Sequence, residues 1–380
     1  MTFFIKTDTI QPNSGSFADL RLSQRARASM DALGAIQVVS SSRIRERAQK
    51  RFESDPRIKA FEAQPFPLSR ADQEERLDSM ADIAKEDSFY RLERFLQRVV
   101  AEENFVRGIP AVEEQREKFD SFYALPESGP TSTLDLGQDD LEVPEYWSTT
   151  DWHLEPGGWD GYDLYGPMMA YAVGPSVFRH GGYAYLPVGA DIRHQRVDFA
   201  KKLPKESYGR IAELGCGGGT TLFAIHRIHP EAELVGFDLS KNLLRGGYAA
   251  SAKLGISVDF KRRDAANTGE PAESYDAVVT YAIHHEMPVE ESIKVFKEAY
   301  RMLKPGGDFL ISDVPPFHAV SPFNALLLDW ETKNRGEPYF RAHCSSNWAE
   351  ELKAIGFEVR EEGGIGPNEY PYVISARKPA

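Results

Sequence analysis

The stretch Ile211-Ala-Glu-Leu-Gly-Cys-Gly-Gly-Gly219 decides how the second half of this chain folds. The apolar residues from Arg210 to Leu214 are typical of a buried strand, and the glycines that follow predict a tight turn into a helix beginning near Thr220. Glycine suits such a turn because it adopts positive φ and lets the backbone approach a ligand closely. The amino end of the helix offers N–H groups that have no partner inside the helix. The stretch therefore predicts a ligand-binding loop at the end of a strand.

A second strand, Glu233 to Phe237, ends in Asp238, nineteen residues after Gly219. An acid at that place suits the two hydroxyls of a ribose. Together the loop and the acid predict an adenosine-type ligand across the tips of these two strands.

The glycine spacing is G-x-G-x-G, whereas the dinucleotide fingerprint is G-x-G-x-x-G. With Glu213 inside the strand, it resembles motif I of the class I S-adenosylmethionine-dependent methyltransferases. Further segments resemble that family in the family's order: Gly236-Phe-Asp-Leu-Ser240, Arg263-Asp-Ala265, Tyr275-Asp-Ala-Val-Val-Thr280 and Leu303-Lys-Pro-Gly-Gly-Asp-Phe-Leu-Ile311. The resemblance covers roughly residues 190 to 380. It implies an α/β fold, a Rossmann-like sheet of seven strands with the last inserted antiparallel and helices on both faces.

The resemblance also implies that S-adenosylmethionine is the cofactor, and it assigns residues to it. The expected cofactor-binding residues are Glu213, Gly215, Cys216, Gly217, Gly219, Asp238, Leu239, Asp264, Ala265 and Tyr281. Asp238 would hold the ribose and Asp264 would contact the adenine. Two alternatives stay open: Glu213 as a buried acid bonded to nearby backbone, and Asp264 as a helix cap.

His284-His285-Glu286 follows the fourth expected strand directly, where the family places groups near the transferring methyl. Methyl transfer from a sulfonium is an in-line displacement, so the protein must mainly position the acceptor. A histidine could also remove a proton from the acceptor, because its pKa lies near physiological pH. We expect His285, and less so His284, in this role. The alternative is that the pair only packs and caps.

The first half of the chain reads differently. Residues 1–20 are expected to be a loose arm, and 21–187 a mainly helical cap or substrate domain ahead of a methyltransferase domain at 188–380. Residues 127–143 resemble a linker. The aromatic-rich stretch 144–187 fits core packing or an apolar substrate pocket. Residues 314–345 are longer than a connecting loop needs and suggest a lid or substrate wall.

Composition narrows the function. The chain has 380 residues and a net charge of −13, which repels nucleic acid phosphates. Two cysteines and the absence of a signal sequence or a long apolar run favour a cytoplasmic protein that does not enter a membrane. His226 and His229 have metal-like spacing, but no further ligands accompany them, so no metal is expected. P-loop and nucleophile-elbow motifs are absent.

These observations predict methyl transfer to a small, apolar or aromatic molecule. Three alternatives remain at this point: a methyltransferase acting on a macromolecule, a methyltransferase-fold protein that binds the cofactor as a partner subunit or for another reaction, and a NAD-dependent dehydrogenase. The chain could form a homo-oligomer.

Overall fold

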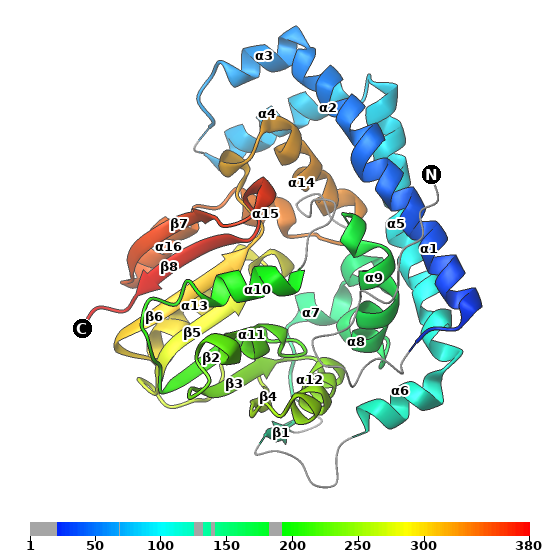
Figure 1. Ribbon diagram of the computed structural model, residues 1–380. Helices are drawn as coiled ribbons and strands as arrows, with labels where there is room; N and C mark the ends of the chain where they lie inside the picture. Colours follow the sequence, from blue (N-terminus) through cyan, green and yellow to red (C-terminus); the bar gives the residue numbers. More distant parts are fainter. Residues whose placement is uncertain (1–20, 68, 125–131, 138–140, 182–191) are drawn as a thin grey trace.

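A computed structural model describes residues 21–67, 69–124, 132–137, 141–181 and 192–380. The expected arm at 1–20 lies outside the described residues. The described chain forms one sheet with helices on both faces, beside a long helical layer (Figure 1).

The sheet has the strand order β1-β4-β3-β2-β5-β6-β8-β7. All neighbouring strands are parallel except β8, which lies antiparallel between β6 and β7. This order confirms the expected α/β fold with an inserted antiparallel strand. The strands are β1 Thr133–Asp135, β2 Arg210–Leu214, β3 Glu233–Asp238, β4 Asp259–Arg262, β5 Tyr275–Tyr281, β6 Leu303–Asp313, β7 Glu358–Gly364 and β8 Tyr372–Arg377.

The expected number of seven strands is wrong by one, because part of the expected linker at 127–143 forms β1. Thr133 pairs with Asp259 in parallel register, and its Oγ1 donates to the Asp259 carboxylate at 2.7 Å. Ser132 Oγ accepts from the Val258 amide at 3.1 Å. The strand forms because the edge of β4 leaves backbone groups unpaired, a cause that lies far away in the sequence.

Crossover helices cover both faces of the sheet. On one face, α13 and α16 contribute Phe296, Trp348 and Leu352 to an apolar cluster. On the other, α10, α11 and α12 contribute Phe199, Leu222 and Leu244. Their bounds are α10 Ile192–Ala200, α11 Thr220–Ile228, α12 Lys241–Leu254, α13 Val289–Met302 and α16 Trp348–Ile355.

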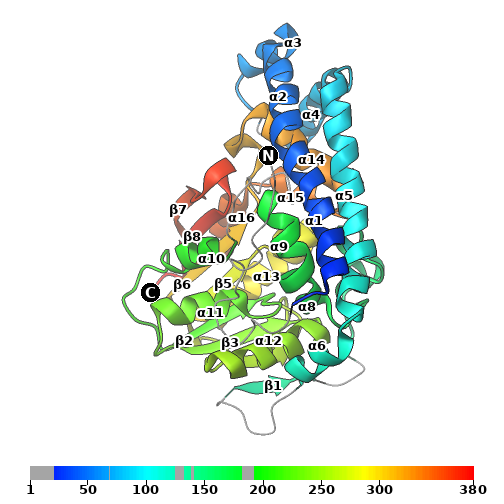
Figure 2. The ribbon, with the colours of Figure 1, turned by 45° about the vertical axis from the view of Figure 1, so that its right-hand side comes forward.

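The first part of the chain is mainly helical, and its long helices α1 and α5 lie side by side in both views (Figures 1 and 2). Its helices are α1 Gln24–Val39, α2 Arg45–Ser54, α3 Pro56–Glu62, α4 Arg70–Ala84, α5 Ser88–Glu113, α6 Arg116–Tyr123, α7 Glu145–Thr149, α8 Tyr165–Met168 and α9 Gly174–Ser176, and a π-helical turn, Ser40–Ile44, joins α1 to α2.

The segment predicted as a lid or wall contains α14 Pro322–Asn334 and α15 Phe340–Cys344. Both helices pack into one apolar cluster with the N-terminal helices. The rings of Phe52 and Phe323 lie 5.4 Å apart, and Arg341 pairs with Asp78 at 2.8 Å. This cluster joins the two parts of the chain, so their division into two domains stays a prediction.

Candidate active site

The glycine loop has the backbone that the sequence predicts. Gly215, Gly217 and Gly219 have φ of 71°, 50° and 74°, values that L-residues rarely adopt. A Cβ on Gly215 would also lie 2.5 Å from the side chain of Ile283. The loop is tied to the next strand, because the amides of Gly215 and Cys216 both donate to the carbonyl of Phe237, at 2.8 and 2.9 Å. Cys216 itself is buried and free.

Asp238 connects the glycine loop to the end of β3. Its carboxylate accepts from the amide of Gly217 at 2.7 Å and from the amide of Ser240 at 2.8 Å. Burial raises the pKa of Asp238 to about 6, although these N–H groups partly oppose the shift. Each oxygen keeps lone pairs for further donors, so the carboxylate can still accept hydroxyl groups such as those of a ribose. The neighbouring Leu239 is buried.

Glu213 lies beneath the loop with 1% of its surface exposed. Burial raises its pKa to about 8, and one carboxylate oxygen has no hydrogen-bond partner. A buried acid in this state gains from a donor that a ligand supplies. With the positive-φ glycines, this orphaned oxygen fits the amino-acid end of S-adenosylmethionine. Tyr281 packs at the same sheet face, under the guanidinium of Arg196 at 4.5 Å from its ring centre and edge-on to Phe199.

Asp264 and Ala265 follow β4 in a short turn. The Asp264 carboxylate accepts from the amide of Ala266 at 2.8 Å, and burial raises its pKa. The contact closes a turn and caps no helix, since none begins directly after Asp264, so the alternative role as a helix cap is wrong. It does not exclude a contact with adenine, since the carboxylate has further acceptor sites.

One segment of the first half, residues 144–165, which we call the cover segment, crosses the carboxyl ends of these strands. Burial and the nearby Asp264 carboxylate raise the pKa of Tyr146. Asp160 accepts from the Ser240 hydroxyl at 2.5 Å and from the amides of Lys241 and Asn242, at 3.3 and 3.4 Å, and so caps α12. Sequence reasoning missed Asp160, because its partners are eighty residues away.

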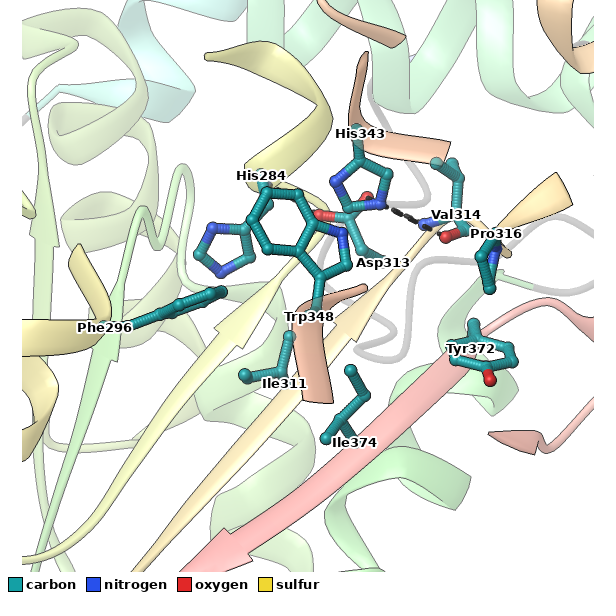
Figure 3. A pocket seen from close by; sticks show the side chains of 10 residues that line it. All are labelled: His284, Phe296, Ile311, Asp313, Val314, Pro316, His343, Trp348, Tyr372 and Ile374. Atoms are coloured by element: carbon teal, nitrogen blue, oxygen red, sulfur yellow. Dashed lines mark hydrogen bonds and ion pairs between the residues drawn. The ribbon is translucent and has the colours of Figure 1, made fainter. Parts of the chain in front are cut away.

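His284 and His285 point in different directions. The ring of His284 lies 4.7 Å from that of Phe296, and its Nε2 lies 3.0 Å from the Thr280 hydroxyl. Burial lowers the pKa of His284 to about 3, so the ring is neutral. Figure 3 shows this ring beside a small cavity that it shares with Asp313, His343 and Trp348. The cavity measures about 10 Å³, roughly the space of one water.

His285 lies between two carboxylates. Its Nδ1 is 2.5 Å from Asp313 and its Nε2 is 3.2 Å from Glu286. Burial disfavours the charged ring, but the two carboxylates outweigh it and raise the pKa of His285 well above the usual value. The ring therefore keeps its proton at neutral pH. A protonated imidazole is not a base, so this geometry favours an orienting role, and the base role stays a prediction.

Glu286 connects this pair to a further group, since its carboxylate also lies 3.2 Å from His153 Nε2 in the cover segment. His153 in turn lies 3.1 Å from Glu337, in the segment between α14 and α15. His153 and Leu154 adopt φ of 57° and 68°, unusual for residues other than glycine. The sequence predicted neither the contact of His153 with Glu286 nor that with Glu337, because the three residues come from distant parts of the sequence.

Comparison with known proteins identifies the type of domain that carries this site. Residues 211–307 match the family model of a methyltransferase domain. Sheet order, glycine loop and family match agree that residues 211–307 form a methyltransferase domain of the class I type, for which S-adenosylmethionine is the cofactor. Of the described residues, no helix is long and apolar enough to cross a membrane.

Two curated relatives show how far the similarity reaches. Methyltransferase phqN of Penicillium fellutanum is 25% identical over 193 residues, which cover 50% of this chain and 58% of that protein. Demethylmenaquinone methyltransferase of Thermus thermophilus is 33% identical over 135 residues, 34% of this chain and 58% of that protein. The chain thus spans little more than half of either relative. A solved S-adenosylmethionine-dependent methyltransferase from Mesorhizobium loti is 20% identical and covers 48% of this chain and 98% of its own, with a TM-score of 0.38.

Proposed function

We propose that this chain transfers a methyl group from S-adenosylmethionine to a small molecule with an apolar or aromatic body. The observation that carries the proposal is the contact of Glu286, just after β5, with His153 of the cover segment, whose ring packs among aromatic side chains. The ring of His153 lies 4.9 Å from that of Trp159, which lies 5.6 Å from Tyr165. Tyr339 contributes a further ring, 6.1 Å from Trp152. Apolar walls with a few buried polar groups are typical of sites for small ligands.

The cofactor supplies an electrophilic methyl group whose leaving atom is a sulfonium sulfur. The carbon–sulfur bond breaks with its electron pair on sulfur, and the new bond uses a lone pair of the acceptor. An acceptor O–H or N–H also loses a proton. The chain contributes the binding site of the cofactor. Gly215 to Gly219 and Asp238 hold the nucleoside part, and the unpartnered oxygen of Glu213 can accept from the ammonium group of the amino-acid part. The rest is positioning, which alone accounts for large rate gains.

His285 has two possible roles within this proposal. As an orienting residue it keeps its proton and fixes Glu286 between His285 and His153. As the base predicted from the sequence it would have to lose a proton that Asp313 and Glu286 stabilise. We favour the orienting role for His285, and a packing role for the neutral His284.

The name of the Thermus thermophilus relative, demethylmenaquinone methyltransferase, supports a small acceptor. The net charge of −13 opposes a nucleic acid acceptor. Two buried free cysteines, Cys216 and Cys344, support a reducing compartment such as the cytoplasm. A homo-oligomer stays a prediction.

The experiment is a transfer assay with methyl-labelled S-adenosylmethionine, in which a panel of small apolar and aromatic acceptors is set against protein and nucleic acid acceptors. Mass spectrometry then locates the methyl in the product. We expect transfer to at least one small molecule. Transfer to macromolecules alone would overturn the small-molecule proposal. Cofactor binding with a different, methyl-free product would instead support the alternative in which the fold serves another reaction.

A further inference from the structure

Three buried side chains from distant parts of the chain meet at the carboxyl end of the sheet: His153 of the cover segment, Glu286 after β5, and Glu337 before α15. We call them the acid–histidine cluster. One potential ligand atom from each lies within 4.8 Å of the others. His153 Nε2 is 3.2 Å from Glu286 Oε1 and 3.1 Å from Glu337 Oε1. The side chains of His153 and Glu286 are only 12% and 13% exposed, and that of Glu337 is 1% exposed.

Several carboxylate oxygens of this cluster have no hydrogen-bond partner. Neither oxygen of Glu337 has a hydrogen bond of acceptable geometry, and Glu286 Oε2 has none either. Two acids that face one imidazole with lone pairs unused need a positive charge between them, and either a proton on the His153 ring or a metal ion in its place supplies it.

We propose that His153, Glu286 and Glu337 bind one divalent transition-metal ion. Imidazole and carboxylate are ligands that Zn²⁺, Mn²⁺ and Fe²⁺ accept together. Ligand atoms 3.1–3.2 Å apart subtend about 95° at a metal that lies about 2.1 Å from each, close to neighbouring positions of an octahedron. Three protein ligands leave coordination positions open, as in metal sites that bind a substrate or water.

A second layer of contacts supports the cluster. Asp313 holds His285 at 2.5 Å, and the opposite ring nitrogen of His285 faces Glu286 at 3.2 Å. Hydrogen-bonded partners of this kind orient metal ligands and hold them in place. The doubly paired His285, which fits poorly as a base, thus acts as a positioning residue, because it fixes the Glu286 carboxylate.

The metal narrows the class of acceptor, and this step rests on the proposed function. An ion with open positions near the Trp159 ring, which packs on His153, suits a small aromatic or apolar molecule with a hydroxyl, amino or carboxylate group that coordinates the metal. Coordination lowers the pKa of a hydroxyl, so such an acceptor can lose its proton without a histidine base.

Metal binding is tested without cofactor or acceptor. Tag-free protein is stripped with a chelator and titrated by calorimetry with Mn²⁺ or Zn²⁺ alone, with Mg²⁺ for comparison, and bound metal is measured by mass spectrometry. We expect one Mn²⁺ or Zn²⁺ ion per chain. Glu337→Gln and, separately, Glu286→Gln should weaken binding at least ~tenfold. Both substitutions keep the side-chain volume and remove a buried charge, and circular dichroism checks their folding.

Glu155→Gln is the matched control. Glu155 is a fully buried carboxylate two residues from His153. It is not one of the three grouped ligands, so its substitution should weaken metal binding far less than Glu337→Gln does. Stoichiometric binding that Glu337→Gln does not weaken would overturn the assignment, as would a wild-type protein that retains and binds none of these ions.

The two proposals fail separately. Affinity of each variant for S-adenosylhomocysteine, measured without metal, should match wild type. If chelator-treated protein without bound metal transfers methyl groups at an unchanged rate, the metal has no part in the reaction, and the proposed function stands. If the protein binds metal as expected but transfers no methyl group to any small molecule, the metal site is supported and the proposed function is refuted.

Discussion

Asp238→Ala is the substitution that tests the cofactor site most directly. In the structure this carboxylate accepts two backbone N–H groups, those of Gly217 and Ser240, and it is the acid expected to hold the ribose. The substitution therefore has two separable effects. It leaves two partly buried donors without a partner, at up to about 1–3 kcal/mol of folding free energy each, and it removes the acceptor for the ligand.

The binding effect follows from the hydrogen bonds that are lost. A bond to a charged acceptor contributes about 1.5–3 kcal/mol, so the dissociation constant for S-adenosylhomocysteine should rise roughly 10- to 150-fold. Isothermal titration calorimetry at pH 7.5 measures it, and denaturant unfolding measures stability on the same samples. Because burial raises the pKa of Asp238 to about 6, wild-type affinity should also weaken as pH falls below about 6. The affinity of Asp238→Ala should not show this weakening at low pH.

Asp87→Ala provides the control, because Asp87 makes the same kind of contact at a distance from the site. It caps α5 by accepting from the amides of Phe89 and Tyr90, at 2.8 and 3.0 Å. Its loss should cost about 1 kcal/mol of stability and leave cofactor affinity unchanged. A folded Asp238→Ala protein with wild-type affinity for S-adenosylhomocysteine would refute the role of Asp238 and with it the placement of the ribose.

Three further predictions follow from the same geometry. Gly217→Val should abolish cofactor binding by calorimetry, because φ is 50° there; wild-type affinity would mean that the ligand lies elsewhere. His285→Gln should leave the pH profile of kcat between pH 6 and 8 unchanged, since the paired ring stays protonated; an apparent pKa near 6.5 that vanishes in the variant would establish the base role instead. The wild-type free energy of unfolding should fall as pH rises from 4.5 to about 8, because burial raises the pKa of Glu155 from the first value to the second. In denaturant titrations Glu155→Gln should make this fall less steep, and an unchanged dependence on pH would contradict the prediction.

Much of the cofactor site could be predicted because it is local. The strand, the glycines and Asp238 lie within thirty residues, and positive φ at Gly215, Gly217 and Gly219 is a property of the turn itself. The extra strand β1 could not be predicted, since Thr133–Asp135 gives too short a pattern and its partner β4 begins at Asp259. The expectation that no metal binds rested on the spacing of candidate ligands in the sequence. His153, Glu286 and Glu337, which we propose as ligands, are too far apart in the sequence to form such a pattern.

By itself the sequence determined the alternation of strands and helices, the glycine turn and the acid at the end of β3, because backbone preference and hydrophobic period act over a few residues. Only the tertiary structure decided what covers the site. Asp160 reaches α12, and His153 reaches Glu286, after the chain has crossed the sheet edge. Burial then set the protonation of each group: neutral for His284, charged for His285. Adjacent histidines with one intrinsic pKa became different because their surroundings differ, and those surroundings are assembled from residues that are far apart in the sequence.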